Sequence, residues 1–523
     1  MFASLIRNIF ITGMAYAVIS VVGLVLAPVL IATYGLAGYG QILLARVFLP
    51  SAAFGFLDLG IGENTTRVVA TARADGSWET AGKALLLLLI IALVVSATTA
   101  GALAWFASNL AVWMSIEPDQ RSSFVIVLLI TAALLPVLFL SLIAEGVLKG
   151  FESFERLRAC EIASALTYAG LAFGAVAGGY GPNSVSLALL AGLTLRFLLA
   201  AIWAVSLLRK HPLRLTKSTT EVRAELFAWS GTMLSNKVLG TLQTQAAAPL
   251  LGLLVGPAAV GLFDAIVRLP RFVKSIFSLL SATVLPLAAR LRAAQDAAAT
   301  TRLAQVGVLS AFVICAPPAV IAATFSYSIL EHWIGERVTP FWMWQALMFT
   351  VPLVNVVVNF GGSILLADRR STIALNRLAF VQVVLQLGLS LILLRWIEPW
   401  SFVLGQVVSV LVVMPLQLSL LKGRLNLSSS IGMRMMGVVG VAAFIAGALY
   451  LLEPRPSIPM LLAQSVAGSA LAWLAAPWIA LDKPGRALFF ALLVARLRSF
   501  GMLLDKRNSR EEGEQPPPPP SKD

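Results

Sequence analysis

Long apolar runs without a single charged residue recur along the whole chain. A helix needs about 20 residues to cross the ~30 Å hydrocarbon core of a bilayer, and each of these runs is long enough. Only 12% of the 523 residues are Asp, Glu, Lys or Arg, which is about half the share in soluble proteins. The sequence therefore predicts an all-α protein that crosses a membrane many times. The runs include residues 84–116, 122–144, 162–195, 303–330, 338–367, 399–421 and 456–481.

The runs and the turns between them predict about fourteen transmembrane helices. Turns such as "YGLAGYG" (34–40) and "GGYGPN" (178–183) separate neighbouring spans, because Gly, Pro and Asn interrupt helices. The predicted spans are 9–33, 41–62, 83–107, 122–147, 159–179, 184–208, 227–255, 258–288, 304–326, 341–366, 376–397, 401–421, 434–453 and 458–481.

The distribution of basic residues predicts which side of the membrane each loop occupies. Loops on the side of the N-terminus, together with the C-terminal tail, carry most of the 39 Lys and Arg, whereas the other side carries Arg121, Arg337 and Arg455. Basic loops stay cytoplasmic, so both termini are expected in the cytoplasm. The net charge of +14 then reflects topology and anionic-lipid contact, and it does not indicate nucleic-acid binding.

Two similar segments indicate an internal repeat. Residues 27–46 (APVLIATYGLAGYGQILLAR) and 248–268 (APLLGLLVGPAAVGLFDAIVR) align at an offset of 221, although chance similarity between Ala-, Gly- and Leu-rich segments is the alternative. The repeat predicts two pseudo-symmetric six-helix lobes, related by an axis along the membrane normal, plus two extra helices. The expected parts are an N-terminal lobe (1–210), a basic cytoplasmic linker (211–226), a C-terminal lobe (227–421), an extra helix pair (434–481), and a cytoplasmic amphipathic segment with a disordered Pro-rich tail (482–523).

Basic residues inside the predicted spans indicate a charged cavity. A Lys or Arg that faces lipid near the bilayer centre costs roughly 2.5–3.5 kcal/mol, so six of them would cost more than the ~5–15 kcal/mol that stabilises a typical domain. A central cationic cavity between the lobes avoids this cost and suits an anionic cargo such as a diphosphate, whose oxygens accept from Arg and Lys. The six residues are Arg46, Arg196, Lys237, Arg268, Arg271 and Lys274.

Several of these residues have alternative interpretations. At about 100° per residue, Arg268, Arg271 and Lys274 share one helix face, and Asp264 lies at its edge. Some of the cations are expected to pair instead with Asp58, Asp264 or Glu161. Arg377 and Arg395, near span ends, are expected to reach the lipid surface. Intramembrane amides could bind sugar hydroxyls or join neighbouring helices, and these amides are Asn236, Gln243, Gln245, Asn355 and Asn359.

The stretch TYGLAGYGQILLARVFLPSAAFGFLDLGIGENTTRVVA (33–70) resembles the N-terminal region of polysaccharide and O-antigen flippases of the multidrug/oligosaccharidyl-lipid/polysaccharide exporter superfamily. In that family a YG turn precedes a helix that ends in a DLG-type motif, and an Arg follows. The matching residues are Tyr39, Gly40, Asp58, Leu59, Gly60 and Arg67. The resemblance implies a V-shaped cavity between two six-helix lobes in the bacterial inner membrane. It also implies transport of an undecaprenyl-pyrophosphate-linked saccharide to the outer leaflet.

Asp58 and Arg67 form a second candidate site, at the cytoplasmic end of the second span. They could close an inner gate as an acid–base pair, or they could be an ordinary helix-end Asp and a positive-inside Arg.

No cofactor is expected, while proton or sodium coupling and other polysaccharide-assembly partners remain open. The isolated Cys160 and Cys315 predict neither a disulfide nor a metal site.

Two other function classes are considered. A cation-coupled multidrug antiporter of the same superfamily would need a carboxylate-lined pocket, and the predicted spans supply few acids for one. A membrane glycosyltransferase or polymerase would present acids or bases on substantial external loops, and the predicted external loops are short. The sequence therefore predicts a transporter and not an enzyme.

Overall fold

The computed structural model describes residues 2–50, 52, 55–282, 297–365, 369–428, 430–487 and 489–490. Within these ranges every regular element is a helix, which confirms the predicted all-α fold. The chain forms two compact units. Unit 1 comprises Met1–Leu279, Ser326–Asn355 and Asp368–Ser419, and unit 2 comprises Leu280–Phe325, Val356–Ala367 and Leu420–Asp523. The predicted lobe and linker boundaries stay a prediction, and almost all of the predicted C-terminal tail lies outside the described residues.

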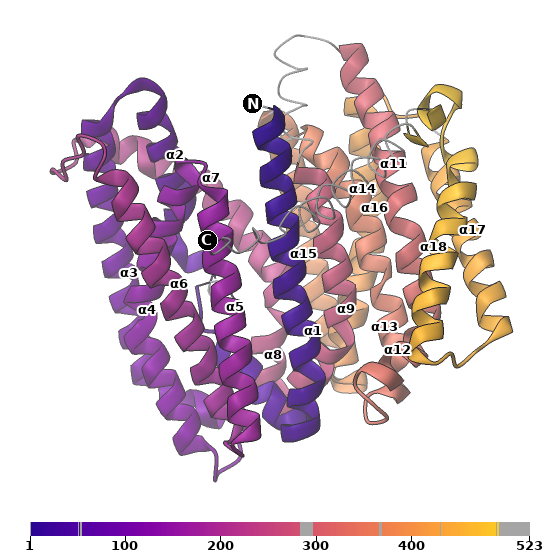
Figure 1. Cartoon of the computed structure of the whole chain (residues 1–523), viewed down its shortest axis with the longest axis horizontal. Coiled ribbons are helices and arrows are strands. Elements are labelled where there is room, and N and C mark those ends of the chain that lie inside the picture. The colour runs from indigo at the N-terminus through magenta and orange to yellow at the C-terminus, as the bar shows by residue number, and fades with distance from the viewer. Residues whose placement is uncertain are drawn as a thin grey trace, which may run out of the picture. The chain divides into compact units, whose positions relative to one another are not determined.

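The helices of unit 1 follow the chain order shown in Figure 1. They are α1 (Phe2–Arg46), η1 (Gly55–Asp58), α2 (Ile61–Asp75), α3 (Trp78–Trp113), α4 (Arg121–Gly150), α5 (Phe154–Ala177), α6 (Pro182–Leu208), α7 (Thr220–Gln245), α8 (Ala247–Leu254), α9 (Pro257–Ala282, whose last turn enters unit 2), α12 (Ser326–Trp333), η2 (Thr339–Phe341), α13 (Trp342–Met348), and α15 (Arg369–Ile397). Two helices pass from unit 1 into unit 2, namely α14 (Thr350–Leu365) and α16 (Trp400–Leu425). Unit 2 also holds α11 (Ala297–Thr324), α17 (Ile431–Leu452) and α18 (Ile458–Ala480).

Within the described part of the chain, 11 helices are long and apolar enough to cross a membrane. The chain is therefore a multi-pass membrane protein, and the predicted number of fourteen spans stays a prediction. The predicted spans 41–62, 227–255 and 258–288 are not among these helices. The first two are interrupted by helix breaks, and the described part of the third carries four charged residues within eleven positions.

The predicted span 41–62 is not one helix. Helix α1 kinks at Gly35 (φ 68°, ψ −177°), ends at Arg46, and is followed by turns and by η1. Leu59 (φ 49°) and Gly60 (φ 73°) then adopt the left-handed region before α2 begins. The Asp58 carboxylate accepts the backbone N–H of Gly60 at 2.8 Å, which stabilises this turn. The DLG motif therefore marks a break in the helix, and this break fixes the position of Asp58.

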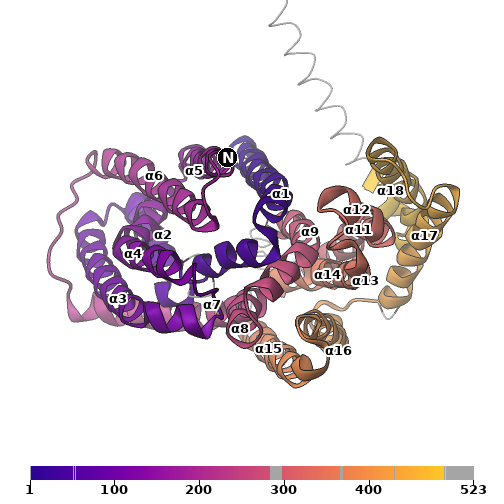
Figure 2. The ribbon, with the colours of Figure 1, turned by 90° about the horizontal axis from the view of Figure 1, so that it is seen from below.

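Helices α2 to α6 pack around one apolar core (Figures 1 and 2). Small residues allow close contact, since a Cβ at Gly146 of α4 would lie 2.7 Å from the Gly62 carbonyl oxygen of α2. A Cβ at Gly192 of α6 would likewise lie 2.7 Å from the Ser164 oxygen of α5. Close backbone approach at small residues is how membrane helices associate without a hydrophobic driving force. The core residues are Val69, Leu85, Ala144, Val147, Leu148, Leu157, Cys160, Ala200 and Ala204.

The two repeated turns pack directly against each other. A Cβ at Gly40 would lie 1.7 Å from the Pro257 carbonyl oxygen, and a Cβ at Gly261 would lie 2.2 Å from the Leu36 carbonyl oxygen. Both Gly40 and Gly261, and Leu36 and Pro257, are separated by the repeat offset of 221, so the contact is reciprocal. The two turns of the repeat therefore lie together in the fold, and the side of the membrane on which they lie stays a prediction.

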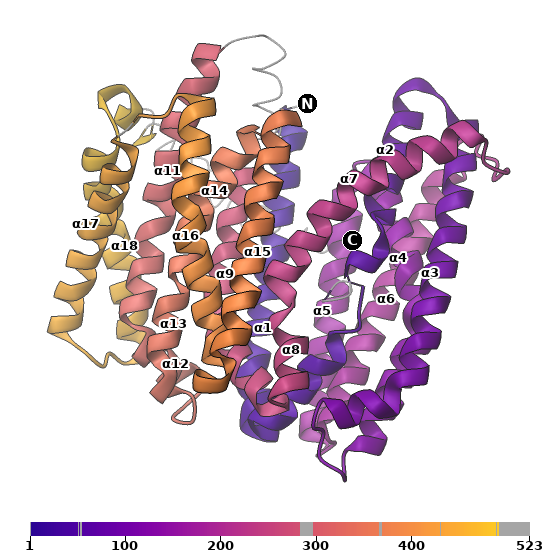
Figure 3. The same ribbon diagram turned by 180° about the vertical axis from the view of Figure 1, so that it is seen from behind.

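Helix α7 packs against η1, α2, α3 and α15 within unit 1 (Figure 3). It begins at Thr220, so the second half of the predicted linker is helical. It ends at Gln245, where Ala246 separates it from α8. The Gln386 amide of α15 donates to the Gln243 carbonyl at 3.0 Å and fastens the end of α7. This end of α7 borders the cavities described below.

In unit 2, α11 packs against both α17 and α18. The Trp473 indole N–H of α18 donates to the Ile314 carbonyl of α11 at 3.0 Å. A Cβ at Gly468 would lie 3.0 Å from Ile321 of α11 and 2.7 Å from Leu449 of α17. Helices α17 and α18 match the predicted spans 434–453 and 458–481 closely.

Candidate functional site

The Asp264 carboxylate on α9 organises the cations of the candidate site. Its Oδ2 accepts from Arg268 Nε at 2.9 Å and Nη2 at 2.6 Å, and from the Tyr39 hydroxyl at 2.6 Å. Arg268 also donates to the Gly23 carbonyl at 2.8 Å and to the Tyr39 hydroxyl. Arg268 is therefore held from three directions, and its guanidinium is anchored to the wall.

Arg271, one turn further along α9, is held much less firmly. Its Nη1 lies 3.5 Å from Asp264 Oδ1, and 37% of its side chain is exposed, against 19% for Arg268. Its guanidinium lies 5.5 Å from the centre of the Phe263 ring, a distance at which cation–π attraction holds the group in place without neutralising it. Arg271 is thus placed to bind an anion.

A cavity of about 290 Å³, which we call the cationic cavity, is lined by Arg46, Asp264, Arg268 and Arg271 among mostly apolar residues. Arg46 comes from the last turn of α1, and its guanidinium lies 5.6 Å from the centre of the Tyr168 ring. Among the residues that the structure describes, no acidic group lies within ion-pair distance of Arg46. The α1 kink and the repeat contact bring the ends of α1 and α9 to this one cavity.

A second cavity of about 300 Å³ shares Arg271 and Gln245 with the cationic cavity. Lys274 lines it, together with polar groups such as Thr244 and Gln406. Within the described ranges, Lys274 likewise has no ion-pair partner. The two cavities together present Arg46, Arg268, Arg271 and Lys274 against the single carboxylate of Asp264. This excess of buried positive charge favours an anionic ligand, because an unbalanced buried charge is costly.

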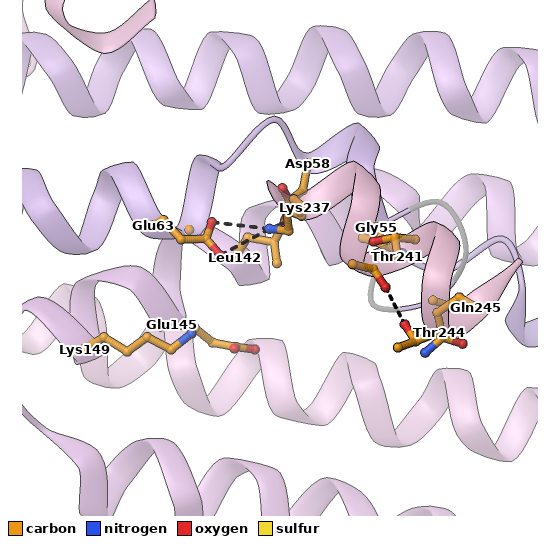
Figure 4. A pocket seen from close by; sticks show the side chains of 14 residues that line it. Gly55, Asp58, Glu63, Leu142, Glu145, Lys149, Lys237, Thr241, Thr244 and Gln245 are labelled. Atoms are coloured by element: carbon orange, nitrogen blue, oxygen red, sulfur yellow. Dashed lines mark hydrogen bonds and ion pairs between the residues drawn. The ribbon is translucent and has the colours of Figure 1, made fainter. Parts of the chain in front are cut away.

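Lys237 on α7 is paired with carboxylates of the broken second span. Its Nζ donates to Asp58 and lies 3.2 Å from Glu63 Oε1. These residues line a third cavity of about 420 Å³, which we call the polar cavity (Figure 4). The structure joins Asp58 to Lys237, and pairing of an embedded cation with Asp58 was one of the predicted alternatives. A gate role for Arg67 on α2 stays a prediction.

Arg196 on α6 belongs to an ionic network inside the N-terminal helices. Its Nε lies 2.8 Å from Glu145 Oε1, and its Nη2 donates to Glu145 Oε2 at 2.8 Å and lies 3.3 Å from Glu161 Oε1. Arg158 binds the other oxygen of Glu161 at 2.5 Å, and Ser141 donates to Glu145 at 3.0 Å. Two cations therefore balance two carboxylates in this network.

The structure thus sorts the six predicted cations into groups. Arg46, Arg268, Arg271 and Lys274 line two cavities that share Arg271 and Gln245, while Lys237 and Arg196 are paired with acids elsewhere in unit 1. Pairing of cations with Asp58, Asp264 and Glu161 was predicted as the alternative, and it is confirmed for each acid. Sequence reasoning missed Tyr39 as a ligand of Arg268 and Glu63 as a partner of Lys237. The position of Tyr39 in the repeated turn was a signal for its contact with Arg268. The contact of Glu63 with Lys237 depends on the helix break, which was not predicted.

Among the predicted amides, Gln245 lines all three cavities. The Asn355 amide donates to the Val351 carbonyl of its own helix at 2.8 Å. The side chain of Asn236 lies outside the described residues. Gln245 stands at the end of α7, and its position in three cavities follows from the break between α7 and α8.

The chain is similar to known proteins in both sequence and fold. A family model described as "Polysaccharide biosynthesis protein" matches residues 5–292. No curated protein matches the chain. Among solved structures, the lipid II flippase MurJ in an inward closed conformation superposes with a TM-score of 0.71 at 14% identity, covering 91% of this chain and 98% of that one.

Two transporter structures give further matches. An inward-facing multidrug resistance MATE family transporter of the MOP superfamily has a TM-score of 0.62 at 14% identity, covering 79% of this chain and 94% of that one. A MATE structure in a bent conformation has a TM-score of 0.55 at 14% identity, covering 81% and 95%. At these identities the likeness shows the fold.

Proposed function

Since the chain belongs to the polysaccharide biosynthesis protein family, whose model it matches over more than half its length, we propose that it is an inner-membrane flippase. Its cargo is a lipid-linked oligosaccharide whose pyrophosphate joins the saccharide to an undecaprenyl chain. The protein moves this cargo from the inner to the outer leaflet for surface polysaccharide synthesis, such as O-antigen or exopolysaccharide. The fold of MurJ and MATE transporters is consistent with transport, and bond chemistry is not part of the proposal.

The observation that carries this proposal is the excess of cations in two cavities that share Arg271 and Gln245. Arg46 and Lys274 have no ion-pair partner among the described residues, and Arg271 keeps only the 3.5 Å contact with Asp264. These three are therefore the proposed ligands of the cargo's phosphate oxygens. Arg268 supports them from the wall, because Asp264, Tyr39 and Gly23 already use its donors. Phosphate binding by Arg and Lys provides strong charge-assisted hydrogen bonds. A cargo without negative charge would leave these cations unbalanced.

A cation-coupled multidrug antiporter is the alternative within the same fold. Such a protein would need carboxylates available to a cationic drug. Asp58 and Glu63 are bound by Lys237, Glu145 is bound by Arg196, and Asp264 is bound by Arg268. Each of these acids therefore has a cation within ion-pair distance, and the flippase proposal accounts better for the charges.

The proposed topology places both termini in the cytoplasm. In a background that lacks Cys160 and Cys315, cysteines introduced at Ala37 and at Ser428 should react with impermeant thiol reagents from opposite sides of the inner membrane. Ala37 lies in the repeated turn, and Ser428 lies between α16 and α17. Labelling of both positions from the same side would contradict this topology.

The functional test is complementation of a flippase-deleted strain. Arg271→Ala should reduce surface polysaccharide and cause the lipid-linked precursor to accumulate, with protein abundance nearly unchanged. Loss of one charged hydrogen-bond contact weakens binding by about 1.5–3 kcal/mol. Arg271→Lys should restore part of the export, since it keeps the charge but loses the bidentate fork.

The matched control is Arg395→Ala, which removes the same charge from an exposed position near the end of α15. This variant should export normally. Full export by an Arg268→Ala/Arg271→Ala double variant at normal abundance would show that these arginines do not bind the cargo.

A further inference from the structure

The polar cavity is built from three separate segments of unit 1. The broken second span contributes Asp58 and Glu63, α4 contributes Glu145 and Lys149, and α7 contributes a row of small and polar residues (Figure 4). The row consists of Gly240, Thr241, Thr244 and Gln245. The volume of the polar cavity, about 420 Å³, falls in the ~300–1,000 Å³ range of small-molecule sites. The acids that line this cavity are paired with Lys237 and Arg196. The proposed function therefore assigns no part of the cargo to the polar cavity.

The polar cavity is continuous in its lining with the cationic cavities. Ala52 and Gln245 line both the polar cavity and the cationic cavity. Thr244 and Gln245 line both the polar cavity and the cavity of Lys274. A ligand whose phosphates lie at Arg271 can therefore extend past Gln245 into the polar cavity.

The hydrogen-bonding groups of the polar cavity suit a sugar. Glu63, with 52% of its side chain exposed, is the most accessible carboxylate, and its oxygens keep lone pairs beyond those bound by Lys237. The Thr244 hydroxyl donates to the Gly240 carbonyl at 2.7 Å, which leaves its oxygen free to accept. Thr241 and the Gln245 amide add further donors and acceptors. Above Gly240 there is open space, because a Cβ there would meet no atom within 4 Å.

The charges of the polar cavity are opposite in balance to those of the cationic cavity. Three carboxylates line it against two lysines. Asp58 and Glu63 share the single charge of Lys237, while Glu145 is paired with Arg196. Lys149 is the remaining lining cation, and it lies exposed in the last turn of α4. A sugar carboxylate in this cavity would lie among three other carboxylates whose counter-charges are already used. Like charges at close range are mutually destabilising.

From this arrangement we propose that the polar cavity binds the sugar unit next to the cargo's diphosphate and selects a neutral sugar over a carboxylate-bearing one. The inference rests on the proposed function, because it needs the diphosphate bound at Arg46, Arg271 and Lys274. It adds a place for the saccharide and a chemical class for its first unit. Neutral hydroxyls donate to Glu63 and accept from Thr241 and Gln245, whereas a uronic acid meets repulsion.

The test compares three probes on the full-length protein in lipid nanodiscs. The probes are farnesyl diphosphate, the same lipid diphosphate carrying N-acetylglucosamine, and the same carrying glucuronic acid. The N-acetylglucosamine probe should bind about tenfold more tightly than farnesyl diphosphate, as expected for one or two added hydrogen bonds. The glucuronic acid probe should bind about tenfold more weakly than the N-acetylglucosamine probe.

Two variants locate the effect. Gly240→Trp should fill the open space and remove the gain from N-acetylglucosamine, while the affinity for farnesyl diphosphate stays unchanged. Its matched control is Gly170→Trp, at an exposed glycine of α5 where an added Cβ would also meet no atom within 4 Å. The Gly170→Trp variant should bind all three probes as the unaltered protein does. Glu63→Gln should remove most of the discrimination against glucuronic acid.

The outcomes separate this inference from the proposed function. If farnesyl diphosphate binds but N-acetylglucosamine adds nothing, the sugar site is wrong and the flippase proposal stands. Glucuronic acid bound as tightly as N-acetylglucosamine, with the affinity lost in Lys149→Gln, would overturn the selection for neutral sugars. If none of the probes binds, both the sugar site and the flippase proposal fail.

Discussion

Two clusters of arginines lie inside the apolar helices of unit 1, and they differ in charge balance. In the network of α4, α5 and α6, Arg158 and Arg196 are matched by Glu145 and Glu161. In the cationic cavities, Arg46, Arg268, Arg271 and Lys274 meet one carboxylate, Asp264. The comparison teaches that a buried basic residue indicates a ligand only when the fold leaves it without an acid.

The physical reason lies in the cost of an unpaired charge. A buried ion pair with good geometry repays much of its desolvation, whereas a lone buried charge does not. The balanced network can therefore exist without ligand and holds three helices together. The cationic cavities gain stability when an anion enters, so they are the region suited to binding. The two regions should respond to substitution in opposite ways.

The largest expected effect is in the balanced network. Arg196→Met leaves Glu145 without its cation and should lower stability by about 3–5 kcal/mol, as for other broken buried pairs. The Arg196→Met/Glu145→Met double variant should recover most of this loss, since both charges are removed together. Thermal unfolding of the purified protein in detergent is the measurement. A single variant as stable as the unaltered protein would show that this network is not structural.

Lys274 and Lys237 test the difference between unpaired and paired cations, because one substitution should change ligand affinity and the other should change stability. Lys274→Gln should weaken binding of farnesyl diphosphate by about tenfold with no loss of thermal stability, because Lys274 is a proposed ligand and has no acidic partner among the described residues. Lys237→Gln should lower stability by about 1–3 kcal/mol, because Asp58 (4% side-chain exposure) loses its cation. Isothermal titration and thermal unfolding on the same preparations check both. The reverse pattern would break the distinction between paired and unpaired cations.

A smaller effect is expected at Tyr39. Its hydroxyl donates to Asp264 and accepts from Arg268, so Tyr39→Phe removes one bridging group and keeps the ring. Stability should fall by about 0.5–1.5 kcal/mol, the usual net contribution of one hydrogen bond. Diphosphate affinity should fall only slightly, since Arg271 keeps its position. Thermal unfolding and titration check this, and a loss of affinity as large as that of Arg271→Ala would make Tyr39 a ligand.

The smallest effect is expected at the surface. The Ser77 hydroxyl and backbone N–H donate to Asp75 at the end of α2, at 2.5 and 2.9 Å, and lower the pKa of its carboxyl. A lowered folded pKa adds stability above the unfolded value of about 3.9, and this stability is lost as the pH falls through the folded value. Because Asp75 is exposed, solvent screens this contribution. Asp75→Asn should therefore lower the unfolding temperature at pH 7 only slightly. A large shift in the unfolding temperature would contradict the view that exposed charges contribute little.

Local spacing made part of the site predictable. Asp264 and Arg268 are four residues apart on one helix, so their pairing follows from helical geometry alone. The repeat offset of 221 was also visible in the sequence, and in the structure the turns at Gly40 and Gly261 touch. Spacing of this kind can be read directly from the sequence, because it does not depend on long-range contacts.

The long-range parts of the site were not predictable in the same way. Asp58 and Lys237 are 179 residues apart, and no local pattern joins them. The apolar sequence of residues 47–57 reads as a continuing helix, although Pro50 was a signal of a break. That break turns Asp58 and Glu63 toward α7 and creates the polar cavity. The contacts that hold Arg268 at the wall, with Asp264, Tyr39 and Gly23, are also in part long-range and were not visible in one sequence.

The most direct test of the central proposal is translocation in reconstituted liposomes. The cargo is a fluorescent polyprenyl-diphosphate-linked N-acetylglucosamine, and its appearance in the opposite leaflet is measured with a membrane-impermeant quencher. The account predicts translocation by the unaltered protein and by the exposed control Arg395→Gln. It predicts little or none by the triple variant Arg46→Gln/Arg271→Gln/Lys274→Gln at equal folded content. Translocation by the triple variant at the unaltered rate would contradict the claim that these three cations carry the cargo's phosphates.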